Sequence, residues 1–175
     1  MNRIWEGEEV FHKYGWEDQT PPEVLLCVYR SPSGSIWFGT WGIGVFRFNP
    51  NTGLFKQFVH DPEDPFSLSS NVVLSIYEDE GGLMWIGTFD NGLNRLNPDT
   101  GVCVHERHDS EMEGSLEFDS VYCIYEERSG DLWLGLQNEG VNRFSRRESQ
   151  FRRLGRDRVN PAQARSQSRS LLPRK

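Results

Sequence analysis

Three tryptophans recur at a constant spacing in this chain of 175 residues. Trp37, Trp85 and Trp133 lie 48 residues apart, and each stands two residues before the second glycine of a short phrase that begins and ends with glycine. The closing glycines of the three phrases are Gly39, Gly87 and Gly135. A constant period without gaps means that one supersecondary unit is copied and stacked on its neighbours. The sequence therefore predicts a repeat protein with these residues as structural anchors.

Each repeat contains four short apolar segments separated by turn residues. In the middle copy the segments span residues 72–78, 83–88, 93–97 and 102–107. Asp, Gly, Pro and Thr gather between them, as in tight turns, and no helical stripe of about 12 residues occurs. Four-stranded antiparallel units with a period between about 40 and 50 residues are typical of β-propeller blades. The predicted fold class is all-β: a β-propeller fragment with three four-stranded antiparallel blades and a partial N-terminal blade.

The recurring tryptophan is predicted to lie between successive blades, since a binding site seldom needs the same residue in every copy. Gly87 lies inside a predicted strand, which indicates close approach of a neighbouring backbone. Cys27 and Cys123 hold equivalent positions two repeats apart, with Ser75 between them in register. We therefore expect small buried residues there, and at Cys103, rather than a disulfide framework.

The register of the repeat predicts how the chain is divided. The predicted parts are a remnant of a preceding blade and its loop at 1–22, blade 1 at 23–59, a loop and blade 2 at 60–107, a loop and blade 3 at 108–154, and a disordered basic tail at 155–175. Residues 2–4 align with third strands, which places Met1 inside a strand, and residues 10–14 align with fourth strands. The favoured interpretation is a piece of a longer propeller. The alternative is that copies of this chain associate through their exposed faces.

Charge is unevenly distributed along the chain. Residues 152–175 hold eight of the 19 basic and one of the 26 acidic residues, so the remainder carries 11 minus 25, or −14. An acidic body argues against nucleic-acid binding, which requires clustered Lys and Arg. The sequence shows no signal peptide and no run of about 18 apolar residues that would form a membrane segment.

Phrases of the middle repeat together resemble a named family, the two-component regulator propeller repeat. These phrases are residues 61–68, 71–79, 82–88 and 92–98, and the resemblance covers residues 2 to about 154. It implies the sensor region of a hybrid two-component histidine kinase, on the periplasmic side of a membrane receptor that detects glycans or their breakdown products. In that family the propellers precede an immunoglobulin-like segment, a membrane helix and a kinase, and the sequence shows none of these.

The loops between second and third strands vary among the copies, at residues 40–43, 88–91 and 136–139. In a propeller these loops share one face with the loops that join fourth to first strands, and binding is expected there. Aromatic faces with amide or carboxylate partners suit sugar hydroxyls. The predicted ligand-binding residues are Trp41, Phe89, Asp90, Asn91, Gln137 and Asn138. Ordinary solvated turns are an equally open interpretation, and Trp16 is a further candidate.

Histidines and carboxylates form no catalytic pattern in the sequence. His60 and His108 occupy equivalent repeat positions and are interpreted as structural, while His12 and His105 fall on predicted outer strands. No nucleophile elbow, phosphate loop or metal-spaced His and Cys cluster occurs. The sequence therefore predicts a chain that is not an enzyme and has neither cofactor nor metal.

Other recurring charged residues are interpreted as structural. Asp61, Asp64 and Asp109 lack the alternating spacing of a calcium loop, and aspartate before proline is common in turns. Three arginines share the repeat spacing and are predicted to form structural ion pairs: Arg47, Arg95 and Arg143.

These observations predict a non-catalytic, ligand-sensing propeller fragment whose parent receptor binds an oligosaccharide or another small ligand. Its other partners would be the remaining propeller blades or further copies of the chain. A self-associating scaffold that binds a protein partner is the alternative function. A propeller lyase or hydrolase is the third.

Overall fold

Strands account for all regular secondary structure in the part of the chain that the structure describes. The computed structural model describes residues 2–5, 8–13, 23–138 and 140–154. Within these ranges there is no helix, and hence none long and apolar enough to cross a membrane. The predictions on Met1, Tyr14, Trp16, Glu139 and the tail 155–175 lie outside the described residues.

The strands form three four-stranded antiparallel sheets and one two-stranded sheet. Blade 1 consists of β3 (Leu25–Arg30), β4 (Ile36–Thr40), β5 (Val45–Phe48) and β6 (Phe55–Phe58). Blade 2 consists of β7 (Val73–Glu78), β8 (Met84–Thr88), β9 (Leu93–Leu96) and β10 (Cys103–Glu106). Blade 3 consists of β11 (Val121–Glu126), β12 (Leu132–Leu136), β13 (Gly140–Ser145) and β14 (Gln150–Leu154). The two-stranded sheet pairs β1 (Asn2–Trp5) with β2 (Glu8–Lys13).

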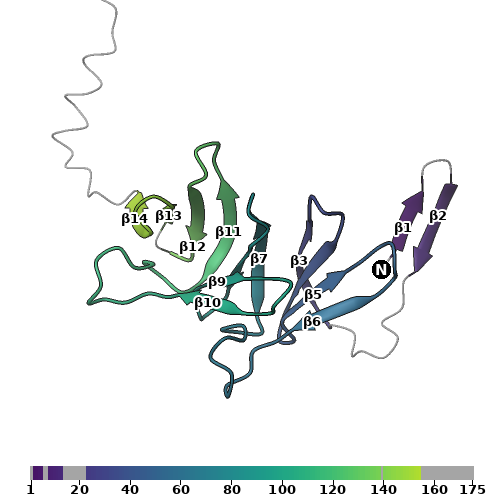
Figure 1. Ribbon diagram of the computed structural model, residues 1–175, viewed down its shortest axis with the longest axis horizontal. Helices are drawn as coiled ribbons and strands as arrows, with labels where there is room; N and C mark the ends of the chain where they lie inside the picture. The colour runs from purple at the N-terminus through teal and green to yellow at the C-terminus, as the bar shows by residue number, and fades with distance from the viewer. Residues whose placement is uncertain (1, 6–7, 14–22, 139, 155–175) are drawn as a thin grey trace, which may run out of the picture.

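Each strand of a blade pairs with the next strand along the chain, so each blade is a meander. The first strands β3, β7 and β11 lie side by side, and the remaining strands of each blade follow outward in order (Figure 1). This arrangement is a row of propeller blades. The predicted fold class is confirmed, and the four strands predicted for the middle repeat agree with β7 to β10 within one residue at each end.

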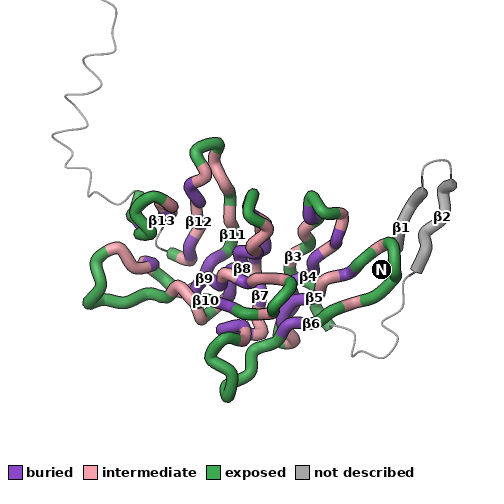
Figure 2. Tube along the Cα trace, in the orientation of Figure 1, coloured by how far each residue is buried: buried purple, intermediate pink, exposed green. Residues whose placement is uncertain are grey.

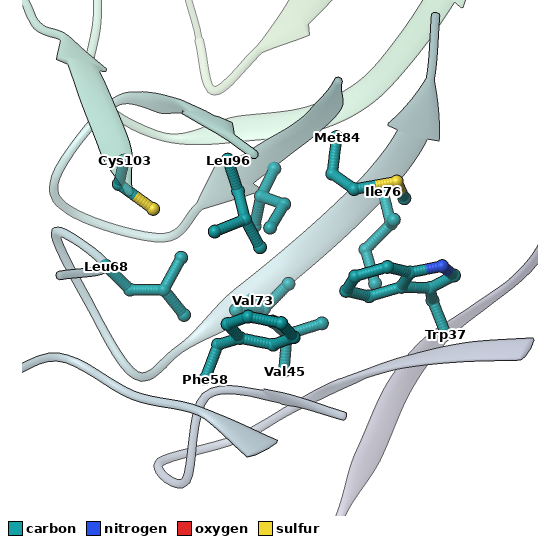
Figure 3. Packing of buried hydrophobic residues seen from close by; sticks show 10 residues of the cluster. Trp37, Val45, Phe58, Leu68, Val73, Ile76, Met84, Leu96 and Cys103 are labelled. Carbon is teal, nitrogen blue, oxygen red and sulfur yellow. The ribbon is translucent and has the colours of Figure 1, made fainter. Parts of the chain in front are cut away.

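Apolar side chains fill the space between adjacent blades. Figure 3 shows Trp37, Val45 and Phe58 of blade 1 facing side chains of blade 2. A second cluster places Trp85 and Leu93 of blade 2 against blade 3 and the loop before it. Because blade 2 has a neighbour on both faces, every residue of β8 is buried.

Close backbone approach between blades explains two of the anchor glycines. A Cβ on Gly39 would lie 2.9 Å from the carbonyl oxygen of Val73, and one on Gly87 would lie 2.5 Å from that of Val121. Both separations are too short for any side chain. The Ser75 hydroxyl donates a hydrogen bond across the same junction to the Val121 carbonyl, at 3.0 Å.

The three cysteines differ in how far they are buried. Cys103 is buried, as predicted, and burial raises its thiol pKa to about 12. Cys27 is partly buried under blade 2, which raises its pKa to about 11. Cys123 is exposed, so the prediction of a buried residue is wrong there. The reason is its place on blade 3, whose corresponding face has no further blade against it among the described residues.

The recurring arginines form ion pairs on the strand next to each tryptophan. Arg47 pairs with Asp99 at 3.9 Å and Arg95 with Glu106 at 3.8 Å, while Arg143 contacts Asp131 at 2.6 Å. The guanidinium groups of Arg47 and Arg95 also lie 5.8 Å and 5.6 Å from the ring centres of Trp37 and Trp85. These contacts agree with the structural interpretation of the arginines.

Candidate functional site

One face of the row is built from the loops between second and third strands and the longer loops between blades. Gly42 and Gly44 donate backbone hydrogen bonds to the Asn71 carbonyl at 3.0 Å and 2.9 Å. At the next junction Gly92 donates to the Asp119 carbonyl at 2.8 Å. These bonds join loops that are distant in sequence, and Figure 2 shows many of the connecting loops as exposed.

The longer loops are held by side chains that repeat. The His60 ring lies 2.6 Å from the Leu68 carbonyl, and the His108 ring lies 2.8 Å from that of Leu116. The aspartates of these loops accept backbone hydrogen bonds from the residue two positions on: Asp61 from Glu63, Asp64 from Phe66 and Asp109 from Glu111. Such bonds define Asx turns. The structural interpretation of both histidines and the turn interpretation of the aspartates are therefore confirmed.

One position of this face has a fixed backbone and a variable side chain. Trp41, Phe89 and Gln137 are equivalent, and their amides donate to the carbonyls of Val24, Val72 and Ser120, each at 3.1 Å. The hydrogen bonds hold the chain identically in all three blades. These backbone hydrogen bonds do not depend on the side chain, which differs among the three blades.

At the first junction this position carries an aromatic pair. The rings of Trp41 and Phe89 lie 5.6 Å apart at an interplanar angle of 50°. Trp41 is about half exposed and Phe89 is partly buried. The pair therefore joins blades 1 and 2 and still presents aromatic surface to solvent.

At the second junction the same face has a pocket of about 350 Å³. Its lining residues are Phe89, Asp90, His108, Phe118, Asp119, Ser120 and Gln137. The structure thus brings together three of the predicted residues, Phe89, Asp90 and Gln137. Sequence reasoning missed the four residues from the loop that precedes β11. Phe118 had a readable signal, because an aromatic residue stands there where the preceding repeat has Ser70.

Some polar groups of the pocket already form hydrogen bonds within the protein, and others remain suited to a ligand. The Ser120 hydroxyl donates to the Phe89 carbonyl, and Asp119 accepts from the His108 amide at 2.7 Å. These groups, like the His108 ring, hold the loops together. Asp90 and Gln137 are left as the polar side chains that are suited to a ligand.

Three predicted residues, Trp41, Asn91 and Asn138, do not line the pocket. The backbone of Asn91 holds the turn, since its N–H donates to the Thr88 hydroxyl at 3.1 Å and its main-chain carbonyl accepts from the Ser69 hydroxyl at 2.8 Å. Asn138 is exposed and has a positive φ of 61°, which asparagine tolerates better than most residues. Among the described residues no group of three or more His, Cys, Asp and Glu side chains is placed to hold a metal ion.

Stacked four-stranded meanders with a recurring indole at each junction define a β-propeller. The sequence profile of the two component regulator propeller family matches residues 67–90 and 115–138. Two stretches of the chain therefore match the repeat of this family, and the resemblance found in the sequence is confirmed. A search of the curated proteins gave no match.

Solved structures with the same fold include two extracellular domains from B. thetaiotaomicron. The extracellular domain of the hybrid two-component system BT3049 has a TM-score of 0.68 and 22% identity over 83% of this chain and 20% of that chain. The corresponding domain of BT4673 has a TM-score of 0.60 and 21% identity over 74% of this chain and 18% of that one. This chain thus spans about a fifth of either relative.

The same fold also occurs in an enzyme. Virginiamycin B lyase from Staphylococcus aureus matches with a TM-score of 0.57 and 18% identity, over 77% of this chain and 42% of that one. At such identities the similarity shows the fold alone.

Proposed function

We propose that this chain is a non-catalytic, ligand-sensing part of an extracytoplasmic receptor, and that its loop face binds an oligosaccharide. The proposal places the chain on the periplasmic side of a membrane, as in a hybrid two-component system. Its repeats and its likeness to the extracellular domains of two hybrid two-component systems support the receptor class.

The observation that carries the proposal is the convergence of non-repeating residues on one pocket. Phe118 replaces Ser70 of the preceding repeat, and Gln137 replaces Phe89, while the hydrogen-bonded backbone beneath them is preserved. Variation on a constant scaffold is the arrangement expected of a binding site. Phe89 and Phe118 offer ring surface to the C–H faces of a sugar, and Asp90 and Gln137 offer acceptors and donors to its hydroxyls.

Trp41 would extend this surface toward blade 1. Its ring contacts Phe89, which also lines the pocket, so aromatic surface continues across two junctions. A ligand longer than one sugar residue would then contact both. This continuity supports an oligosaccharide rather than a monosaccharide.

Binding to a glycan array, followed by calorimetry with the best glycan, tests the proposal. Phe118→Ala and Gln137→Ala are expected to weaken binding by about tenfold each, which is about 1.4 kcal/mol. Phe66→Ala is the matched control, because Phe66 is an exposed loop aromatic outside the pocket. No glycan binding, or equal binding by all four proteins, would contradict the proposal. Release of a cleaved product would instead favour the lyase or hydrolase alternative.

A further inference from the structure

The pocket at the second junction contains two carboxylates that have no counterpart at the first junction. Asp90 and Asp119 both line the pocket, and its lining residues include no Lys or Arg. In the repeat register the residue equivalent to Asp90 is Gly42. The residue equivalent to Asp119 is Asn71. The second junction therefore carries two additional negative charges on the same scaffold.

The fold does not require the charge of Asp119. At the first junction Asn71 Oδ1 accepts a hydrogen bond from the His60 backbone N–H at 2.7 Å. At the second junction Asp119 Oδ1 accepts from the His108 backbone N–H at the same distance, 2.7 Å. A neutral amide therefore forms the bond that holds this loop as well as a carboxylate does. The negative charge of Asp119 and its second oxygen, Oδ2, remain for another role.

The fold does not require the carboxylate of Asp90 either. This residue is exposed in its loop, and the third repeat has the uncharged Asn138 at the equivalent position. In the part of the chain that the structure describes, no Lys or Arg forms an ion pair with Asp90 or Asp119. Both negative charges of the pocket are therefore available to a ligand.

The other groups of the pocket suit a positively charged ligand. The rings of Phe89 and Phe118 line the pocket beside the two carboxylates. The face of an aromatic ring attracts a cation, and a carboxylate accepts strong hydrogen bonds from an ammonium group. A sulfate or uronate group would instead be repelled by both carboxylates. This combination favours an amino group over an acidic group on the ligand.

The loops around the pocket have the same sign of charge. The loops before blades 2 and 3, residues 60–72 and 108–120, contain three and five Asp or Glu residues and no Lys or Arg. Arg153 of β14 contacts Glu117 of the second loop at 3.5 Å, so that loop keeps a net negative charge. A surface of one sign raises the local concentration of ligands of the opposite sign.

We propose that the ligand of this pocket is an oligosaccharide of amino sugars with free amino groups, which bind at the carboxylates of Asp90 and Asp119. The inference rests on the proposed function, because it assigns the class of sugar that the same pocket binds. The aromatic rings contact the sugar, and the two carboxylates select the positive charge.

Calorimetry of the whole chain with two matched ligands tests this assignment. A chitosan oligosaccharide and a chitin oligosaccharide of equal length differ only in the acetyl groups that remove the positive charge. At about pH 6 the free amino groups are protonated. The chitosan oligosaccharide is expected to bind about tenfold more tightly than the chitin oligosaccharide, and added salt is expected to reduce this difference.

Variants that remove one charge identify the carboxylates responsible. Asp119→Asn introduces the residue of the first junction and keeps the acceptor for His108, and Asp90→Asn introduces the residue of the third repeat. Each is expected to weaken chitosan binding by about tenfold and to leave chitin binding nearly unchanged. Glu111→Gln is the matched control, because it removes one charge from the same loop outside the pocket, and it should bind like the wild type.

Four results would overturn the assignment. Equal or tighter binding of the chitin oligosaccharide would remove the amino group and leave oligosaccharide binding in place. Equal weakening by Glu111→Gln would show that net charge alone attracts the ligand. Equally tight binding of spermine, which has amino groups but no sugar ring, would exclude a sugar as the preferred ligand. Absence of binding to any oligosaccharide would contradict the proposed function as well.

Discussion

Blades 2 and 3 have nearly the same pattern of strands but differ in what surrounds them. Blade 2 has a blade on either side. Three of its residues touch blade 3: Trp85, Gly87 of the second strand and Ser75 of the first strand. In blade 3 the equivalents Trp133, Gly135 and Cys123 meet no further blade among the described residues. Equivalent residues therefore contribute different amounts to the stability of the fold, because the next blade determines whether they are buried.

The largest difference is expected at the tryptophans. Trp85 is buried, and its indole N–H donates to Asp79 at 2.9 Å, so Trp85→Ala should cost about 4 kcal/mol of unfolding free energy. Trp133→Ala should cost about half as much or less, since one side of the ring is open. Urea denaturation of the two variants measures both values. Equal losses would mean that blade 3 is as well covered as blade 2.

The anchor glycines give a second comparison between blades 2 and 3. A Cβ on Gly87 would meet the Val121 backbone, which cannot move without separating the blades, so Gly87→Ala should destabilise by about 3 kcal/mol. A Cβ on Gly135 would meet only the Cys123 thiol, which can turn into solvent. Gly135→Ala should therefore cost about 1 kcal/mol. Thermal unfolding of both variants distinguishes these values, and a larger loss for Gly135→Ala would contradict the account.

Thiol labelling compares the exposure of the three cysteines without mutation. Burial raises the pKa of Cys27 to about 11 and that of Cys103 to about 12, so little reactive thiolate is present at either position near neutral pH. Cys123 is exposed and should react about a hundredfold faster with a thiol reagent. Peptide mapping after a short pulse should find the label at Cys123. Comparable labelling of Cys27 would show that the first junction opens readily.

The smallest expected effect concerns a buried amide. Asn94 of blade 2 donates to the Ser69 hydroxyl at 2.8 Å, but the equivalent Asn142 of blade 3 has an unpaired amide nitrogen because Glu117 replaces the serine. Glu117→Ser should supply the missing acceptor and stabilise the fold by about 1 kcal/mol. Loss of the exposed pair between Glu117 and Arg153 should offset little of this. A lower melting temperature for the variant would contradict the prediction.

The repeat made most of the fold predictable, because each segment of one copy aligns with the same segment in the two others. The burial of each residue could not be predicted from one repeat, because it depends on which blades lie next to that repeat. Cys123 and Cys27 look equivalent in sequence, and only the order of the blades distinguishes the exposed thiol from the partly covered one.

The candidate site was predictable in part. The variable loop position identified Phe89 and Gln137, because the contrast with a constant frame is visible in sequence. Phe118 was missed because it lies in the long loop before β11, whose path beside Phe89 depends on tertiary hydrogen bonds. Asn91 lies outside the pocket, and the bonds that hold its turn use its backbone, so its side-chain type did not indicate its position relative to the pocket.

Hydroxyl-radical footprinting of the individual tryptophans, at a concentration where the chain is monomeric, measures whether the recurring indoles lie between blades. We predict that Trp37 and Trp85 are protected by the blades that follow them, while Trp133 and Trp41 are oxidised readily. Oxidation of Trp37 and Trp85 at the rate of Trp133 would contradict the account, because the indoles would then not lie between blades.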